Sequence, residues 1–213
     1  MTETTTIRGD DLTARFSDKA RAVAAIVEPV ADLDAAFAYC VDLCGRRGAC
    51  RITVSGCDEA LSPPADHLCD RKQGKIVAAP GLAPEQFAAL AARCTDQGMT
   101  CLRTGMRNNL SGVDIGFTIA DLGIAETGTL VLNCPGEELR LATMLSEYHV
   151  CVLRRSTIVA DAFAADRLLL DYMRKTPDYT AFITGASRTA DIERVLALGV
   201  HGPLELHILL LED

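Results

Sequence analysis

Residues 112–132, GVDIGFTIADLGIAETGTLVL, contain two apolar segments on either side of a short polar elbow. The segments 113–120 and 129–133 are rich in residues that favour strands, whereas the elbow at 121–128 carries the glycines that favour turns. Short apolar runs of this kind are typical of strands buried in a parallel sheet. The stretch therefore predicts two sheet strands joined by a tight connection.

Outward from this stretch, short apolar runs alternate with helical patterns of 10–15 residues. This alternation is typical of βαβ units, so we predict an open α/β fold with a mostly parallel sheet covered on both faces. Further strands are predicted at 51–55, 75–79, 99–102, 150–153, 179–183 and 204–211, helices at 34–45, 83–97, 137–146 and 161–175, and a loop or short helix at 103–111.

The N-terminal part has a helical pattern of its own. Apolar residues from Phe16 to Val30 recur at helical spacing, and Pro29 is expected to end that element. We therefore expect an N-terminal helical extension over residues 1–48, packed on an α/β domain over 49–213.

Length and charge limit the classes of function. The 213 residues suffice for one large domain with a full hydrophobic core. A net charge of −8 and the lack of a long Lys/Arg cluster argue against nucleic-acid binding. The sequence has neither a secretory signal nor an apolar run near the ~20 residues that span a bilayer, so we expect a cytoplasmic protein without a membrane span.

The nine cysteines form no Cys-x-x-Cys pair, and an odd number does not suit a disulfide framework. Cys40 and Cys44 continue the apolar stripe of one predicted helix, and Cys94 continues that of another. Cysteines in such positions are usually small buried hydrophobes. We expect no iron–sulfur or zinc site in this chain.

The segment 184–193, TGASRTADIE, follows the predicted strand at 179–183. A strand, a glycine turn and a helix start form a common anion-binding arrangement, because free amides and the helix dipole favour negative charge. Arg188 adds a fork that grips a carboxylate or phosphate. The alternative is a helix cap, with a hydroxyl on the first turn and a permissive glycine. The residues concerned are Thr184, Gly185, Ser187, Arg188 and Thr189.

Three stretches, 112–132, 184–193 and 198–210 (LGVHGPLELHILL), resemble the LUD (lactate utilization) domain family and occur in the same order as in that family. More narrowly, they resemble the small C-type subunit of the three-part lactate utilization system. The resemblance is dense from Gly112 onward and thin before it. It implies a Rossmann-like three-layer sandwich of the NagB/RpiA/CoA-transferase-like type.

The same resemblance implies an accessory or ligand-binding subunit of an iron–sulfur-dependent L-lactate oxidation system. Iron–sulfur clusters are then expected only in partner subunits, and this chain is expected to bind no cofactor. The ligand would be a small carboxylate or a phosphate, and a homodimer is compatible with this role.

The elbow offers the second group of site residues. Glu126 is expected to act as a base or nucleophile beside a ligand or, alternatively, to hold the turn. Thr127, Gly128 and Thr129 would complete a cleft between the Glu126 and Arg188 loops. Residue His201, in a Gly-Pro turn, is suited to proton transfer or to fixing the turn.

No dinucleotide, P-loop, nucleophile-elbow or metalloprotease motif is present. The sequence therefore leaves open whether this chain is an enzyme. The competing interpretations are a stand-alone enzyme acting on a sugar phosphate or CoA thioester through Glu126, and a pure assembly scaffold.

Overall fold

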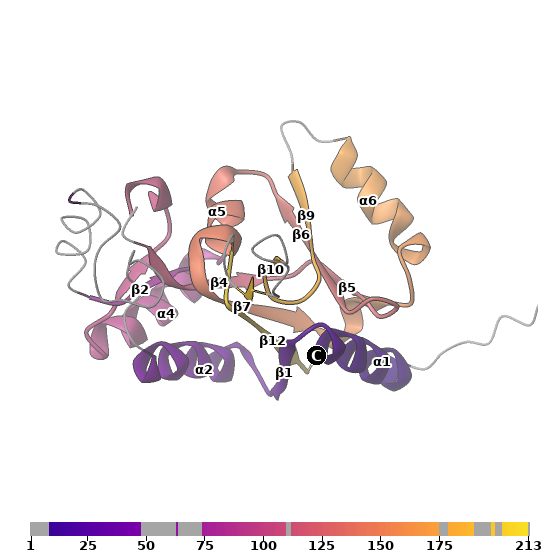
Figure 1. Ribbon diagram of the computed structural model, residues 1–213, viewed down its shortest axis with the longest axis horizontal. Helices are drawn as coiled ribbons and strands as arrows, with labels where there is room; N and C mark the ends of the chain where they lie inside the picture. Colours follow the sequence, from indigo (N-terminus) through magenta and orange to yellow (C-terminus); the bar gives the residue numbers. More distant parts are fainter. Residues whose placement is uncertain are drawn as a thin grey trace, which may run out of the picture.

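The computed structural model describes residues 9–47, 63, 74–109, 112–174, 179–189, 197–198 and 202–212. A six-stranded sheet with the order β1-β12-β7-β4-β2-β3 runs through the molecule, and every neighbouring pair in it is parallel (Figure 1). Its strands are β1 (Ala25–Val30), β2 (Ile76–Ala78), β3 (Thr100–Leu102), β4 (Val113–Ile119), β7 (Ser146–Arg154) and β12 (Glu205–Leu211). The prediction of an α/β fold with a mostly parallel sheet is confirmed.

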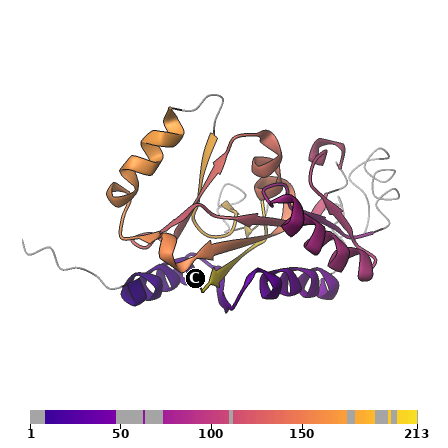
Figure 2. The same ribbon diagram turned by 180° about the vertical axis from the view of Figure 1, so that it is seen from behind.

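Helices α2 (Leu33–Arg46) and α4 (Pro84–Asp96) cover one face of this sheet, which we call the α2 face. Phe37, Leu90 and Phe117 lie in the core there, and Asp32 caps α2 by accepting from the Ala35 amide at 2.7 Å. Both helices were predicted from their apolar periodicity. In Figures 1 and 2 they lie together at one end of the molecule, with α1 (Gly9–Ala22) and α6 (Asp166–Met173) at the other.

The opposite face is covered by α1, by α5 (Glu137–Leu145) and by a second sheet with the order β8-β5-β6-β9. This sheet consists of β5 (Leu122–Ile124), β6 (Thr129–Cys134), β8 (Ile158–Val159) and β9 (Tyr179–Ile183). β6 pairs antiparallel with both β5 and β9. The strands predicted at 129–133 and 179–183 therefore exist, but they belong to this smaller mixed sheet.

The predicted N-terminal helix is wrong beyond residue 22. Helix α1 ends there, Ala24 adopts a left-handed backbone with φ +65°, and β1 follows. Val27 and Val30 keep helical spacing from Phe16 by coincidence, and no glycine marks the break. Pro29 is tolerated because β1 is at the edge of the sheet and, among the described strands, pairs only with β12.

Residues 9–47 thus add a strand to the main sheet as well as two helices. The boundary predicted between residues 48 and 49 lies outside the described residues and stays a prediction, as does the strand at 51–55.

Other elements differ in length. The strand predicted at 150–153 extends over all of β7, and the helix predicted at 161–175 divides into the 3-10 turn Phe163–Ala165 and α6. The 103–111 segment contains the 3-10 turn Met106–Asn108. The remaining short elements are the 3-10 turn Arg155–Thr157 and the strands β10 (Arg188–Thr189) and β11 (Ala197–Leu198).

Five of the six described cysteines are buried. Cys40, Cys44 and Cys94 are buried on helices, as expected for residues on apolar stripes, and Cys134 and Cys151 are buried on β6 and β7. Within the described ranges, no three His, Cys, Asp or Glu side chains are grouped so as to hold a metal ion. None of the described helices is long and apolar enough to cross a membrane.

Candidate functional site

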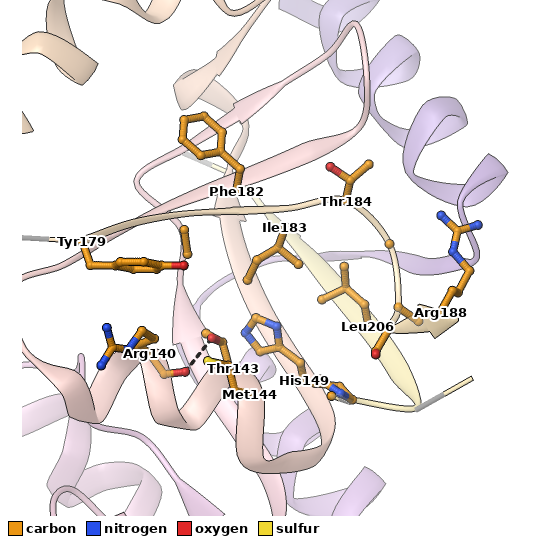
Figure 3. Close-up of a pocket in the computed structure, with 16 residues that line it drawn as sticks. Arg140, Thr143, Met144, His149, Tyr179, Phe182, Ile183, Thr184, Arg188 and Leu206 are labelled. Carbon is orange, nitrogen blue, oxygen red and sulfur yellow. Dashed lines mark hydrogen bonds between the residues drawn. The ribbon is translucent and has the colours of Figure 1, made fainter. Parts of the chain in front are cut away.

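A cavity of about 460 Å³ lies on the face of the main sheet opposite α2, beneath the loop that follows β9. Its walls come from α5, β7, β9, the 184–188 loop and the residues that lead into β12 (Figure 3). This volume is within the range of small-molecule sites. Because α5 precedes β7 and Gly202-Pro203 precede β12, the cavity lies toward the N-terminal ends of these strands and not at their carboxyl ends.

Helix α5 forms one wall because Gly116 lets it approach β4 closely. A Cβ atom at residue 116 would overlap the carbonyl oxygen of Ala142, so any larger residue would push α5 away. The Ser146 hydroxyl donates to the same carbonyl at 2.8 Å and holds the end of the helix. This packing turns Arg140, Thr143 and Met144 toward the cavity.

His149 on β7 is the most deeply buried polar side chain of the cavity, with 1% of its surface exposed. Its Nε2 atom is 2.8 Å from the Thr118 hydroxyl, and Nδ1 has no partner among the described residues. Burial, followed by the charge of His207, lowers the pKa of His149 to about 4. The imidazole is therefore neutral near pH 7.

Arg140 lies at one end of the cavity. Its guanidinium carbon is 5.1 Å from the centre of the Tyr179 ring, a cation–π distance. The guanidinium has no hydrogen bond or close ion pair with any described residue, although its charge contributes, after Arg107, to lowering the pKa of Glu137 on the same helix. No Asp or Glu is among the described residues that line the cavity. A half-buried arginine without a carboxylate partner is able to receive an anion.

The loop after β9 closes the other end. Gly185 has φ +76°, and a Cβ there would overlap the carbonyl oxygen of Val23, so the loop packs directly against the end of α1. The Ser187 amide donates to the Pro203 carbonyl at 3.1 Å. Thr184, Gly185, Ser187 and Arg188 all line the cavity, but Arg188 is exposed and its guanidinium points toward α1 in Figure 3.

Residues Arg188–Thr189 form β10, which pairs antiparallel with β11, so Ser187 does not cap a helix. A helix that begins after Thr189 would fall on residues 190–196, which lie outside the described residues, and it stays a prediction. The side chain of Thr189 and the whole of His201 lie outside the described residues.

The Glu126 elbow lies next to this loop but does not line the cavity. Glu126 and Thr127 are exposed, and the Glu126 amide donates to the Ala160 carbonyl at 3.0 Å. Gly128, with φ +67°, lets the elbow pack against Ala20. Thr129 joins the two loops, because its hydroxyl is 2.7 Å from those of both Thr127 and Thr184. The two loops are therefore in contact, but only the 184–188 loop lines the cavity.

Asp114 and Asp121 are carboxylates near the two ends of the apolar segment 113–120. Asp114 accepts from the Ile76 amide at 2.7 Å, and Asp121 accepts from the Asn133 amide at 2.6 Å. Each carboxylate therefore accepts a hydrogen bond from a backbone amide.

Four cavity residues with polar side chains were missed from the sequence: Arg140, Thr143, His149 and Tyr179. His149 stands in no sequence motif, and Arg140 is one charge on an ordinary amphipathic helix. The sequence signal for His149 is a histidine inside an apolar strand, because a buried imidazole needs a polar partner.

The α2 face carries a second polar group of residues around His207, which is buried. The Tyr39 hydroxyl is 2.8 Å from Nδ1 of His207, and Nε2 is 2.9 Å from the Glu205 carboxylate. Arg47 donates to the same carboxylate at 2.8 Å and 2.9 Å. Burial lowers the pKa of His207, and Glu205 opposes that effect.

Comparisons with known proteins agree with this architecture. A sequence profile described as the LUD domain matches residues 13–211. "Lactate utilization protein C" of Shouchella clausii is 35% identical over 102 residues, which cover 47% of this chain and 44% of that protein. The protein of the same name from Anoxybacillus flavithermus is 32% identical over 143 residues, covering 66% of this chain and 64% of that one.

Each of these matches spans less than two thirds of the relative's own length. Among solved structures, a DUF162 family protein from Deinococcus radiodurans has a TM-score of 0.60, with 17% identity and coverage of 96% of this chain and 99% of that one. At this identity the likeness concerns the fold.

Proposed function

The chain belongs to the LUD domain family, and from that premise we propose that it is an anion-binding component of a lactate utilization system. The names of the relatives from Shouchella clausii and Anoxybacillus flavithermus support the system. The cavity beside Arg140 supports the binding role.

The composition of the cavity wall carries the proposal. In a chain of net charge −8, the described lining holds two arginines and no carboxylate. Arg140 is half-buried and its guanidinium has no protein partner among the described residues. Local positive charge in a chain that is acidic overall favours a small anion over a cation.

A carboxylate fits this cavity wall better than a monatomic anion does. The planar guanidinium of Arg140 presents parallel N–H donors that pair with two carboxylate oxygens. Ile183 and Leu206 supply apolar surface for a short hydrocarbon part, and the Ser187 hydroxyl supplies a further polar contact. The Thr143 hydroxyl donates to the Arg140 carbonyl at 2.8 Å, so only its oxygen lone pairs are available to a ligand. We therefore infer a small carboxylate such as L-lactate, with phosphate as the competing anion.

This location departs from the cleft predicted between the Glu126 and Arg188 loops. Arg188 remains at the rim of the cavity, whereas Glu126 is exposed on the far side of the Thr129–Thr184 contact. We propose that iron–sulfur subunits of the same system carry the electrons and that this chain presents or senses the acid.

Growth on L-lactate tests this proposal. The gene is deleted, and the strain is complemented with the wild type, with Arg140→Ala or with Glu126→Gln. We expect the wild type and Glu126→Gln to restore growth and Arg140→Ala to fail at equal protein level. Normal growth of the deletion strain on L-lactate would refute a role in lactate utilization.

A further inference from the structure

Building on the proposed anion site, we propose that the cavity selects a 2-hydroxy acid, with the ligand hydroxyl donating a hydrogen bond to Nδ1 of His149. The ligand carboxylate would pair with Arg140. This assigns the cavity a preference for the reduced acid over the matching 2-oxo acid.

The first step is the position of His149. It is nearly fully buried, lines the cavity, and lies among Thr143, Ile183 and Leu206 in Figure 3. Only Nε2 has a partner among the described residues. Nδ1 is therefore available to pair with a group that enters the cavity.

The second step is the tautomer, which the partners of Thr118 determine. Thr118 and Cys151 are opposite each other on neighbouring strands. The Cys151 thiol donates to the Val152 carbonyl at 3.8 Å. Burial raises the pKa of Cys151 to about 12, and a hydrogen bond from the Thr118 hydroxyl to its sulfur opposes that rise.

A hydroxyl has one proton to donate. If Thr118 donates to Cys151, its oxygen accepts from His149, and the proton of the imidazole is on Nε2. Nδ1 then carries a lone pair that faces the cavity. A lone pair accepts from an alcohol and not from a ketone, so the site distinguishes a hydroxyl from a carbonyl oxygen on the carbon next to the carboxylate.

Charge supports the same arrangement. Because His149 is buried and neutral, it does not add a positive charge that would attract any anion equally. Arg140 is the cation for the carboxylate, and Figure 3 shows Thr143 between it and His149. The two functions of the site, charge recognition and hydroxyl recognition, are thus carried by different side chains.

The test compares three acids of three carbons that differ only at the second carbon: L-lactate, pyruvate and propionate. Calorimetric titration of the full chain at pH 7 should show L-lactate binding about tenfold tighter than either of the others, as expected for one hydrogen bond. Inorganic phosphate is titrated in parallel.

Two variants separate the ring nitrogens. Asn places a polar atom near the position of Nδ1, and Gln places one near that of Nε2. His149→Asn should keep the preference for L-lactate, whereas His149→Gln should bind all three acids about equally. Melting curves confirm that each variant is folded, and Thr143→Val serves as a cavity variant that leaves both ring nitrogens in place.

The outcomes are distinct. Equal affinity of the wild type for the three acids would refute hydroxyl recognition while leaving the proposed anion site intact. Tighter binding of pyruvate than of L-lactate would overturn the assigned tautomer and with it the inference. Failure of all four anions to bind the wild type would remove the anion site itself.

Discussion

The two faces of the main sheet each bury a histidine, and the two histidines differ in what surrounds them. On the α2 face, both ring nitrogens of His207 are paired, with Tyr39 and with Glu205. On the cavity face, His149 pairs through Nε2 alone among the described residues. A histidine with both nitrogens paired stabilises the fold, and one with a nitrogen facing a cavity is available to a ligand.

The arginines repeat the contrast. Arg47 on the α2 face donates twice to Glu205 and lies 4.9 Å from the Tyr148 ring. Arg140 on the cavity face has the equivalent ring contact with Tyr179 but no carboxylate partner among the described residues. The polar group on the α2 face already contains a carboxylate, whereas the described lining of the cavity has none.

The largest expected effect concerns the pH dependence of stability. The folded-state pKa of His149 is about 4, below the unfolded value near 6.5, so the unfolded chain takes up a proton first as the pH falls. Stability from this group is complete above pH 6.5 and is lost between 6.5 and about 4, in total about 3 kcal/mol.

Denaturant melts from pH 7 to pH 4 measure this loss. His149→Gln, which does not titrate, should show a shallower decline than the wild type. His207→Gln should keep most of the slope, because Glu205 opposes the effect of burial on His207. Equal slopes for the wild type and His149→Gln would mean that His149 is not a buried neutral group.

The next effect is on binding. Arg140→Ala should weaken L-lactate binding roughly 10- to 100-fold, because it removes charge-assisted hydrogen bonds. Arg188→Ala, the matched control, should change affinity only about threefold, as expected for an exposed charge at the rim. Calorimetric titrations measure both. A larger loss for Arg188→Ala would move the anion to the 184–188 loop.

A smaller effect is expected on the α2 face. Tyr39→Phe removes the hydroxyl that donates to Nδ1 of His207 and should lower the free energy of unfolding by about 1 kcal/mol. Affinity for L-lactate should be unchanged. Loss of affinity without loss of stability would indicate that the α2 face, not the cavity face, contacts the ligand.

The smallest effect is expected for Glu126→Gln, which should alter neither stability nor L-lactate affinity by more than about 0.5 kcal/mol, as for other exposed substitutions. The side chain is exposed and outside the cavity lining. A large loss of affinity in titrations of this variant would restore the cleft predicted between the two loops.

The success of sequence prediction differed between fold and site for a physical reason. Buried strands and amphipathic helices leave a periodic pattern, so α2, α4, β4 and β6 were predicted closely. The end of α1 was missed because Ala24, not glycine, takes the left-handed conformation.

The site depends on contacts between distant parts of the chain. The turn at Gly185 was recognised and does border the cavity, but its partners on α5 and β7 are determined by packing that no local pattern encodes. Whether a histidine is fully paired is visible only once Thr118, Tyr39 and Glu205 have been placed beside His149 and His207.

Nitrogen-15 spectra of the imidazole rings during titration with L-lactate test most directly whether the cavity face binds the acid. The chain has four histidines, and the spectra of His149→Gln and His207→Gln assign the two that matter. We predict that the His149 ring signals shift and saturate with added L-lactate while those of His207 stay constant. A saturable shift of His207 with none at His149, or no shift at either ring, would contradict the assignment of the anion site to the cavity.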